Sequence, residues 1–205
     1  MARYFDVHPT DPQPRSIAQV VAMLRDDAVI AYPTDSMYAL GTRLGNHDGA
    51  ERIRRIRNLD DRHHFTLVCC DFAQLGQLVH LDNSAFRAIK SATPGPYTFI
   101  LPATPEVPRR LAHPKKRSVG VRIPDDPVAL AILRELGEPL VSSSLLVPGH
   151  DWPMSEGWQI KEELDDVLDA VVDAGDRGSE PTTVVDWTDG APEVVREGAG
   201  DPLRF

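Results

Sequence analysis

Residues 31–41 read Ala31-Tyr32-Pro33-Thr34-Asp35-Ser36-Met37-Tyr38-Ala39-Leu40-Gly41, and they place small polar side chains directly after an apolar segment. That apolar segment, at 28–32, is typical of a buried strand. It is followed by the hydroxyls of Thr34 and Ser36, which can donate to anionic oxygens, and by the charge of Asp35. Polar side chains at the ends of strands often face a ligand, so this stretch predicts a binding site at one end of a sheet strand.

The apolar residues on both sides of this stretch predict helices and strands in alternation. Ile17, Val20 and Leu24 recur at helical spacing, and Asp48 and Asp71 are candidate helix caps. We expect helices at 17–24, 48–59, from 71 onward, 83–91, 127–136 and 158–164, and strands at 28–32, 65–70, 97–101, 119–123, 140–144, 168–172, 183–187 and 193–196. This alternation favours an α/β fold. The closely spaced late strands indicate hairpin pairing, and therefore a mixed sheet.

The composition fits one compact domain that spans 1–205. The chain has 205 residues, 41% of them hydrophobic, which is enough for one sizeable core. It shows neither a charged-then-apolar leader nor an apolar run of membrane-spanning length, so we expect a cytoplasmic protein with no membrane partner. The neighbouring Cys69 and Cys70 cannot close a loop by pairing with each other, and we expect them to be reduced packing groups.

The net charge of −9 is distributed unevenly along the chain. From Asp151 onward there are 15 acidic and 4 basic residues, whereas half of the 22 Lys and Arg residues fall within 52–62 and 109–122. If both basic windows line one concave face, that face can hold phosphates. The sequence has neither of the common glycine-rich phosphate-binding motifs, so convergent arginines would have to take their place.

The stretch at 31–41 also resembles the P-T-[DE]-[ST]-x-Y-[AG]-L-G signature that opens the YrdC-like (threonylcarbamoyl-adenylate synthase) superfamily. Four later segments resemble further signatures of that superfamily in the same order: Pro94-Gly95-Pro96-Tyr97-Thr98, Val119-Gly120-Val121-Arg122-Ile123-Pro124, Pro139-Leu140-Val141-Ser142-Ser143-Ser144 and Pro181-Thr182-Thr183-Val184-Val185-Asp186. Phe65-Thr66-Leu67 and Val107-Pro108-Arg109-Arg110-Leu111 are similar to the YciO branch. The resemblance implies a twisted mixed α/β sheet with flanking helices around a large concave basic cleft.

The synthases in this superfamily join L-threonine, bicarbonate and ATP into threonylcarbamoyl-adenylate, with release of pyrophosphate, for a tRNA modification. The resemblance therefore implies a nucleotide and a small amino acid as partners, with ATP and Mg²⁺ as cofactors. It implies substrate contacts from Thr34, Asp35, Tyr38, Arg122 and Ser142, and nucleotide contacts from Arg55, Arg57, Thr98, Ser144 and Arg196. We expect no metal site built by the protein alone, and no single residue is identified as catalytic.

Two departures from the synthase pattern bear on activity. The Lys-x-Arg pair of the synthases aligns with Arg55-Ile56-Arg57, and their Ser-x-Asn pair aligns with Ser144-Leu145-Leu146. Leucine cannot replace the hydrogen bonds of asparagine, and the absence of one such bond costs about 1–3 kcal/mol, up to roughly a hundredfold in rate or binding. We therefore expect weak or altered activity.

Several candidate site residues also fit an ordinary structural role that involves no ligand. An arginine on a helix or near a strand end is more often a solvated charge or an ion-pair partner. Asp35 can hold an amino group or Mg²⁺, but an acid after a strand is often a turn or cap residue. His63 and His64 can contact a carboxylate or a phosphate, although adjacent histidines in polar loops are more often simply exposed.

The segment 108–117 has the charge density of a flexible basic loop, and it is the best candidate for contact with RNA phosphates. The resemblance implies double-stranded RNA or tRNA as the partner, and no DNA partner is expected. The RNA-binding candidates are Arg52, Arg54, Arg109, Arg110, Lys115, Lys116 and Arg117. The alternative for this segment is a solubilising surface loop. Two functions stay open: an ATP-using synthase-like enzyme, or a non-catalytic RNA-binding module.

Overall fold

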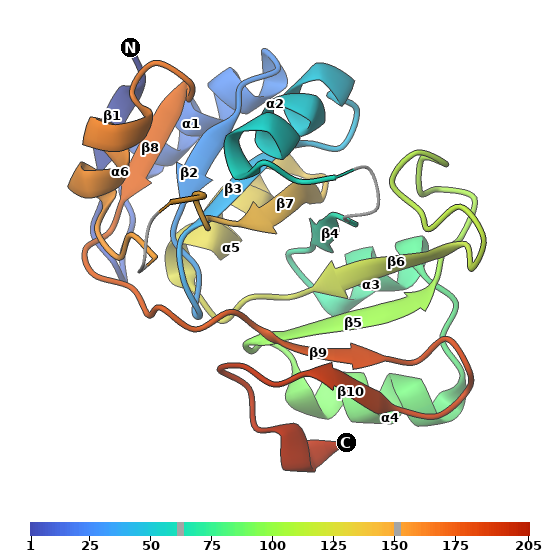
Figure 1. Cartoon of the computed structure of the whole chain (residues 1–205). Helices are drawn as coiled ribbons and strands as arrows, with labels where there is room; N and C mark the ends of the chain where they lie inside the picture. The colour runs from blue at the N-terminus through green and yellow to red at the C-terminus, as the bar shows by residue number, and fades with distance from the viewer. Residues whose placement is uncertain (61–63, 150–152) are drawn as a thin grey trace.

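A computed structural model describes residues 1–60, 64–149 and 153–205 of the chain, and a ten-stranded mixed sheet runs through its centre (Figure 1). The strands lie in the order β1-β8-β2-β3-β7-β4-β6-β5-β9-β10. The strands are β1 (Arg3–Asp6), β2 (Ile30–Tyr32), β3 (Ala39–Arg43), β4 (Thr66–Val68), β5 (Tyr97–Pro102), β6 (Ser118–Arg122), β7 (Leu140–Ser144), β8 (Ala170–Asp173), β9 (Thr183–Asp186) and β10 (Glu193–Arg196). The predicted twisted mixed α/β fold is confirmed.

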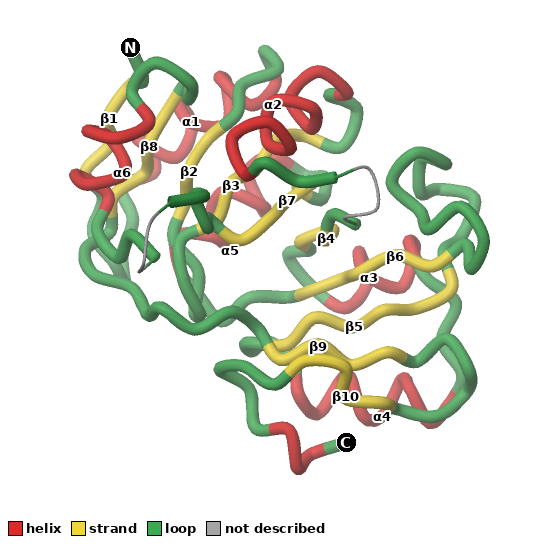
Figure 2. Tube along the Cα trace, viewed as in Figure 1, coloured by secondary structure: helices red, strands yellow, loops and turns green. Residues whose placement is uncertain are grey.

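Helices cover both faces of the half of the sheet that contains β1, β8, β2, β3 and β7 (Figures 1 and 2). The helices of the chain are α1 (Pro14–Arg25), α2 (His47–Arg57), α3 (Phe72–Leu78), α4 (Asn83–Ala92), α5 (Pro127–Leu136) and α6 (Gly157–Leu164), with a 3₁₀ turn at Pro202–Arg204. Apolar residues of α1 and α5 pack with Ile30 and Tyr32 on one face. Ile53 of α2 and Ile160 of α6 belong to the core on the other face.

The other half of the sheet, from β4 to β10, has helices α3 and α4 on one face only (Figure 1). Side chains alternate across a strand, so Tyr97, Phe99 and Leu101 of β5 enter the core beneath these helices. Thr98 and Ile100 point to the opposite face, where they line a cavity. The fold thus leaves one concave sheet surface uncovered, and this surface carries the candidate site.

Strands β1 and β3 were not predicted. Strand β3 follows the polar turn at 33–38 and pairs antiparallel with both β2 and β7. The predicted cap Asp48 is wrong, because the side chain of Asn46 caps α2: its oxygen accepts from Gly49 N at 2.8 Å and its nitrogen donates to the Asp27 carbonyl at 2.7 Å. The helix ends at Arg57, and Asn58 takes the left-handed conformation with φ of 50°.

Both cysteines are free, and Cys69 is completely buried. Burial, followed by the nearby Cys70 and Asp71, raises the pKa of the Cys69 thiol. This environment is that of a packing group and not of a reactive thiolate. Across the described residues, every helix is too short or too polar to cross a membrane.

The hydroxyl of Tyr38 joins the turn before β3 to the end of β8. It donates to the Gly175 carbonyl at 2.8 Å and accepts from Ala174 N at 3.2 Å, and it lies 3.2 Å from a carboxylate oxygen of Asp173. The side chain is fully buried and does not line the cavity on the uncovered sheet surface. In contrast to the predicted substrate contact, Tyr38 holds two segments of the fold together.

We therefore expect Tyr38→Phe to lower the free energy of unfolding by about 1–3 kcal/mol, because it leaves buried polar groups without a partner. Urea denaturation followed by circular dichroism measures this decrease. Tyr4→Phe is the matched control: its hydroxyl also donates to Asp173, but the residue is 43% exposed and water can replace it. Equal decreases in stability in the two variants would contradict the account.

Candidate functional site

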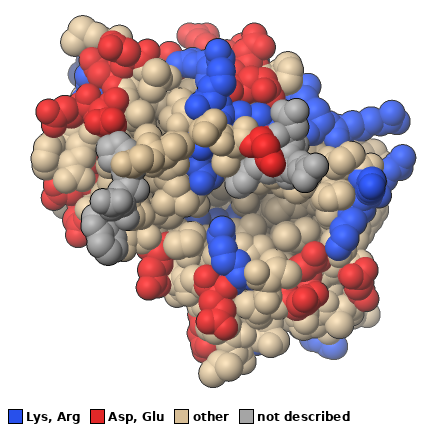
Figure 3. All heavy atoms as spheres, in the orientation of Figure 1, with Lys and Arg blue, Asp and Glu red and all other residues tan. Residues whose placement is uncertain are grey.

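A cavity of about 330 Å³ lies on the uncovered sheet surface, and this volume falls in the range of small-molecule sites. Figure 3 shows this face of the molecule hollowed in the middle, with Lys and Arg side chains on both sides of the hollow. The predicted site residues that line the cavity are Arg57, Thr98, Arg122, Ser142, Ser144 and Arg196. They come from α2, β5, β6, β7 and β10, so the fold brings together residues that are far apart in sequence.

Arg122, at the end of β6, is a buried cation that is held by the turn after β2. Its guanidinium forms an ion pair with Asp35 and lies 3.4 Å from the hydroxyl oxygen of Thr34. The Thr34 hydroxyl itself donates to the Met37 carbonyl at 2.6 Å. Thr34 and Asp35 therefore position Arg122 and do not line the cavity, which differs from the predicted substrate or Mg²⁺ contact. Within the described residues, Arg122 Nε and one Asp35 oxygen have no hydrogen-bond partner.

Arg57 and Arg196 are held mainly by uncharged oxygens. Arg57, the last residue of α2, donates from Nε to the Leu146 carbonyl at 3.3 Å and from a terminal nitrogen to the Ser143 hydroxyl. Arg196 donates to the Thr182 carbonyl at 3.1 and 2.8 Å. Neutral acceptors fix the two guanidinium groups without cancelling their charge.

We call Arg57, Arg122 and Arg196 the guanidinium cluster, because all three line the same cavity. Burial, and then the charge of Arg196, lower the pKa of Arg57. Burial, and then the charge of Arg122, lower the pKa of Arg196. A bound anion would relieve this repulsion between like charges, so the cluster has the electrostatics of an anion-binding site.

Hydroxyl groups line the floor of the cavity. Ser142 donates to the Leu40 carbonyl at 2.9 Å and lies 2.8 Å from the hydroxyl of Tyr32, whose pKa burial raises to about 12. Because the hydroxyl proton of Ser142 is used in its hydrogen bond to Leu40, Ser142 can act toward a ligand mainly as an acceptor. Thr98 shares a 2.8 Å hydrogen bond with Thr182, which was not predicted as a site residue although it lies in the segment 181–186.

Arg55 does not belong to this cavity, in contrast to the prediction. It lies with Arg52 beside a second cavity between α2 and the segment 164–167. Residues two apart in a helix point to different sides, so Arg55 and Arg57 cannot both face the same hollow. The chain thus offers one guanidinium where the synthase pattern has two basic residues.

The RNA-binding candidates fall into two groups. On α2, Arg52 forms an ion pair with Asp169 at 2.8 Å, and Arg54 pairs with Glu51 and lies over the Phe65 ring. These two side chains are therefore engaged in contacts within the protein. The loop candidates are exposed: Arg109, Arg110, Lys115, Lys116 and Arg117. Lys116 also lines the cavity, together with His64, His113 and Asp186. His64 was considered as a phosphate contact, whereas His113 and Asp186 were not predicted as site residues. His63 lies outside the described residues.

The residues present fit a polyphosphate better than they fit a metal ion. Guanidinium groups donate paired hydrogen bonds that match phosphate oxygens. Within the part of the chain that the structure describes, three or more metal-ligating side chains are nowhere grouped as a metal site. Any Mg²⁺ used here would accordingly depend on phosphate oxygens for much of its coordination.

Comparison with known proteins gives consistent relationships. The family described as telomere recombination, which groups Sua5, YciO and YrdC proteins, matches residues 22–198. The YciO protein of Escherichia coli is 48% identical over the full length of both chains, and its crystal structure superposes with a TM-score of 0.96. The threonylcarbamoyl-AMP synthase of Bacillus subtilis is 31% identical over 92% of this chain and 54% of its own.

A solved Sua5 protein from P. abyssi, in complex with L-threonine, shares the fold. Its TM-score is 0.87 at 23% identity, over 95% of this chain and 57% of its own. The predicted resemblance is confirmed by these matches together with the shared mixed sheet. The chain belongs to the Sua5/YciO/YrdC family.

Proposed function

We propose that this protein binds a nucleoside triphosphate and a small amino acid in the cavity on the uncovered sheet surface, and that it carries out threonylcarbamoyl-adenylate chemistry at a reduced rate or on an altered substrate. The observation that carries the proposal is the guanidinium cluster around a cavity of about 330 Å³. Its relatives named threonylcarbamoyl-AMP synthase support the reaction class.

In this reaction ATP supplies the adenylyl group, and pyrophosphate leaves with the negative charge of the broken bond. Arg57 and Arg196 would neutralise that charge, because both are cations held in place before the ligand arrives. Arg122 would face the carboxylate of the amino acid, and the Sua5 protein solved with L-threonine makes threonine the first substrate to test. Catalysis would come from positioning and charge neutralisation, without a nucleophile from the protein.

Leu146 is the residue that most directly limits the proposed rate. Its side chain lines the cavity, whereas its carbonyl accepts from Arg57. The backbone contact is independent of the side chain, so an asparagine at this position can keep Arg57 in place. The absence of the amide would then deprive the ligand of one hydrogen bond and leave the guanidinium cluster intact.

We expect Leu146→Asn to raise the rate of pyrophosphate release by about tenfold to a hundredfold, because one polar contact is worth about 1–3 kcal/mol. The assay supplies threonine, bicarbonate, Mg²⁺ and ATP, and measures pyrophosphate with and without threonine. Ile100→Asn is the matched control, since Ile100 lines another wall of the same cavity and is also partly buried.

The enzyme proposal fails if neither the wild type nor Leu146→Asn releases threonine-dependent pyrophosphate. An equal gain in Ile100→Asn would show that any added polar group has the same effect. Binding of ATP is measured in parallel by thermal shift, because a ligand that binds the native state raises the apparent stability.

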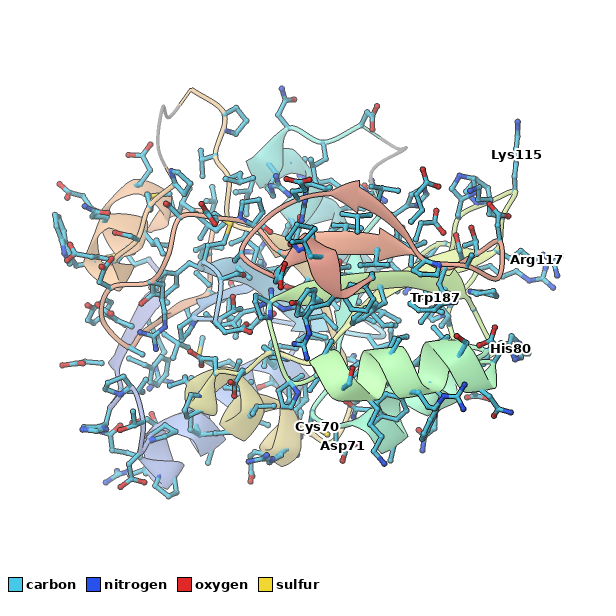
Figure 4. All side chains as sticks on the ribbon, turned by 90° about the horizontal axis from the view of Figure 1, so that it is seen from below. Cys70, Asp71, His80, Lys115, Arg117 and Trp187 are labelled. Atoms are coloured by element: carbon cyan, nitrogen blue, oxygen red, sulfur yellow. The ribbon has the colours of Figure 1, made fainter. Side chains whose placement is uncertain are left out.

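A second candidate function, RNA binding, is favoured by the basic loop between β5 and β6. Figure 4 shows Lys115 and Arg117 pointing away from the body of the molecule. Exposed cations of this kind can contact phosphates of structured RNA with little sequence preference. The arginines of α2 contribute less than the sequence suggests, because Arg52 and Arg54 are engaged within the fold.

Reversal of four loop charges, with Arg109, Arg110, Lys115 and Lys116 replaced by Glu, should weaken binding to double-stranded RNA. The slope of log affinity against log salt should also flatten, by about 0.7–0.9 for each phosphate that the loop no longer neutralises. Filter binding at several salt concentrations measures both effects. The same reversal at exposed Arg15, Arg87, Lys90 and Arg134 is the control. An unchanged slope in the loop variant would exclude this loop as the part of the protein that binds RNA.

A further inference from the structure

The loop between β5 and β6 is anchored at several points, although its composition suggests flexibility. Val107 and Leu111 are buried with 4% exposure each. The Ala103 amide donates to the Arg117 carbonyl at 2.8 Å, and the His113 amide donates to the Ser118 carbonyl at 2.7 Å. These hydrogen bonds hold the residues that this loop presents to the cavity in fixed positions.

His113 occupies a tight turn that determines where its ring carries a proton. Its Nδ1 accepts from the backbone amides of Lys115 at 3.2 Å and Lys116 at 3.0 Å. A ring nitrogen that accepts hydrogen bonds has no proton, so the neutral ring must carry its proton on Nε2. His113 also lines the cavity on the uncovered sheet surface. His113 can thus offer the cavity a fixed N–H donor, and it cannot offer a lone pair on Nε2 to a metal ion without giving up the turn.

Lys116 is the basic residue of this turn that lines the cavity. Its ammonium lies 3.7 Å from a carboxylate oxygen of Asp186 and 3.5 Å from the Thr188 hydroxyl. The other Asp186 oxygen accepts from the Thr188 amide and hydroxyl at 2.8 and 2.7 Å. The ion pair is therefore long and its carboxylate already has other partners, so Lys116 can turn toward an anion at small cost.

His64 lies beside this turn, with its ring centroid 4.7 Å from that of His113. Burial, and then the charges of His113 and Arg54, lower the pKa of His64. The His64 ring is therefore uncharged near pH 7, and it adds no further positive charge to this end of the cavity. Among the described residues at this end of the cavity, His113 and Lys116 are placed to bind an anion, and we call them the outer donor pair.

We propose that the cavity binds anions at two places, the guanidinium cluster and the outer donor pair, and that the outer donor pair holds the terminal phosphate of a linear polyphosphate. This inference rests on the proposed function and specifies its ligand: a molecule with two or more linked phosphates is preferred over a single phosphate. A small ligand is favoured over RNA for this pair because both side chains line the cavity, while the neighbouring Lys115 and Arg117 point away from the body of the molecule (Figure 4).

The test measures the affinity of inorganic phosphate, pyrophosphate and tripolyphosphate by isothermal titration calorimetry. His113→Asn keeps a side-chain oxygen to accept the two backbone amides but removes the Nε2–H donor. Lys116→Gln removes the ammonium from an exposed position, where folding tolerates the change. We expect each variant to bind tripolyphosphate about tenfold more weakly and phosphate less than twofold more weakly, because single phosphates occupy the guanidinium cluster.

Lys115→Gln removes the same charge one residue earlier, and it should weaken tripolyphosphate binding less than twofold. The proposal is overturned if Lys115→Gln and Lys116→Gln weaken tripolyphosphate binding equally, or if the variants lose phosphate and tripolyphosphate affinity in parallel. It is also overturned if wild type does not prefer tripolyphosphate to phosphate, or if the two variants weaken binding to double-stranded RNA alone.

This experiment separates the inference from the proposed function, because it uses neither a nucleoside nor an amino acid. Selective loss of tripolyphosphate binding without pyrophosphate release from ATP would support the outer donor pair and reject the synthase chemistry. Threonine-dependent pyrophosphate release that His113→Asn and Lys116→Gln leave unchanged, with unchanged tripolyphosphate affinity, would support the chemistry and reject the outer donor pair.

Discussion

Three positively charged guanidinium groups line one cavity because the fold supplies a hydrogen-bond acceptor or a carboxylate for each of them. Arg122 is neutralised by Asp35, whereas Arg57 and Arg196 rest mainly on carbonyl and hydroxyl oxygens. Two of the three guanidinium groups keep most of their charge available to a ligand. The uncovered face of β4, β6, β5 and β9 gives that ligand its space, since α3 and α4 pack only on the opposite face.

The same arrangement explains how a departure from the synthase pattern is tolerated. Arg57 contacts the Leu146 carbonyl and the Ser143 hydroxyl, so the edge of the site depends on backbone position and on one hydroxyl near the end of β7. Replacement of an asparagine side chain by leucine would therefore change contacts to a ligand in the cavity more than it changes the architecture. A family member can in this way retain the cavity and its charge while its chemistry changes.

The sequence predicted those features that depend on the local pattern of side chains, such as the helices and most of the strands. It did not predict contacts that depend on the order of strands in the sheet or on the rotational phase of a helix. The apolar pattern predicted the strands at 97–101 and 119–123, and the family resemblance selected Thr98, Arg122 and Arg196, which line the cavity. No local pattern revealed the ion pair between Asp35 and Arg122, because these residues are 87 positions apart in the sequence. Arg55 was misplaced because the exact phase of α2 decides which arginine faces the cavity.

A crystal structure of the protein grown with ATP and Mg²⁺ tests most simply whether the guanidinium groups bind phosphate. We expect phosphate density in the cavity on the uncovered sheet surface, with phosphate oxygens within hydrogen-bond distance of Arg57 and Arg196. Phosphate density at another surface, or inside the cavity but out of reach of both of these guanidinium groups, would rule out their proposed role.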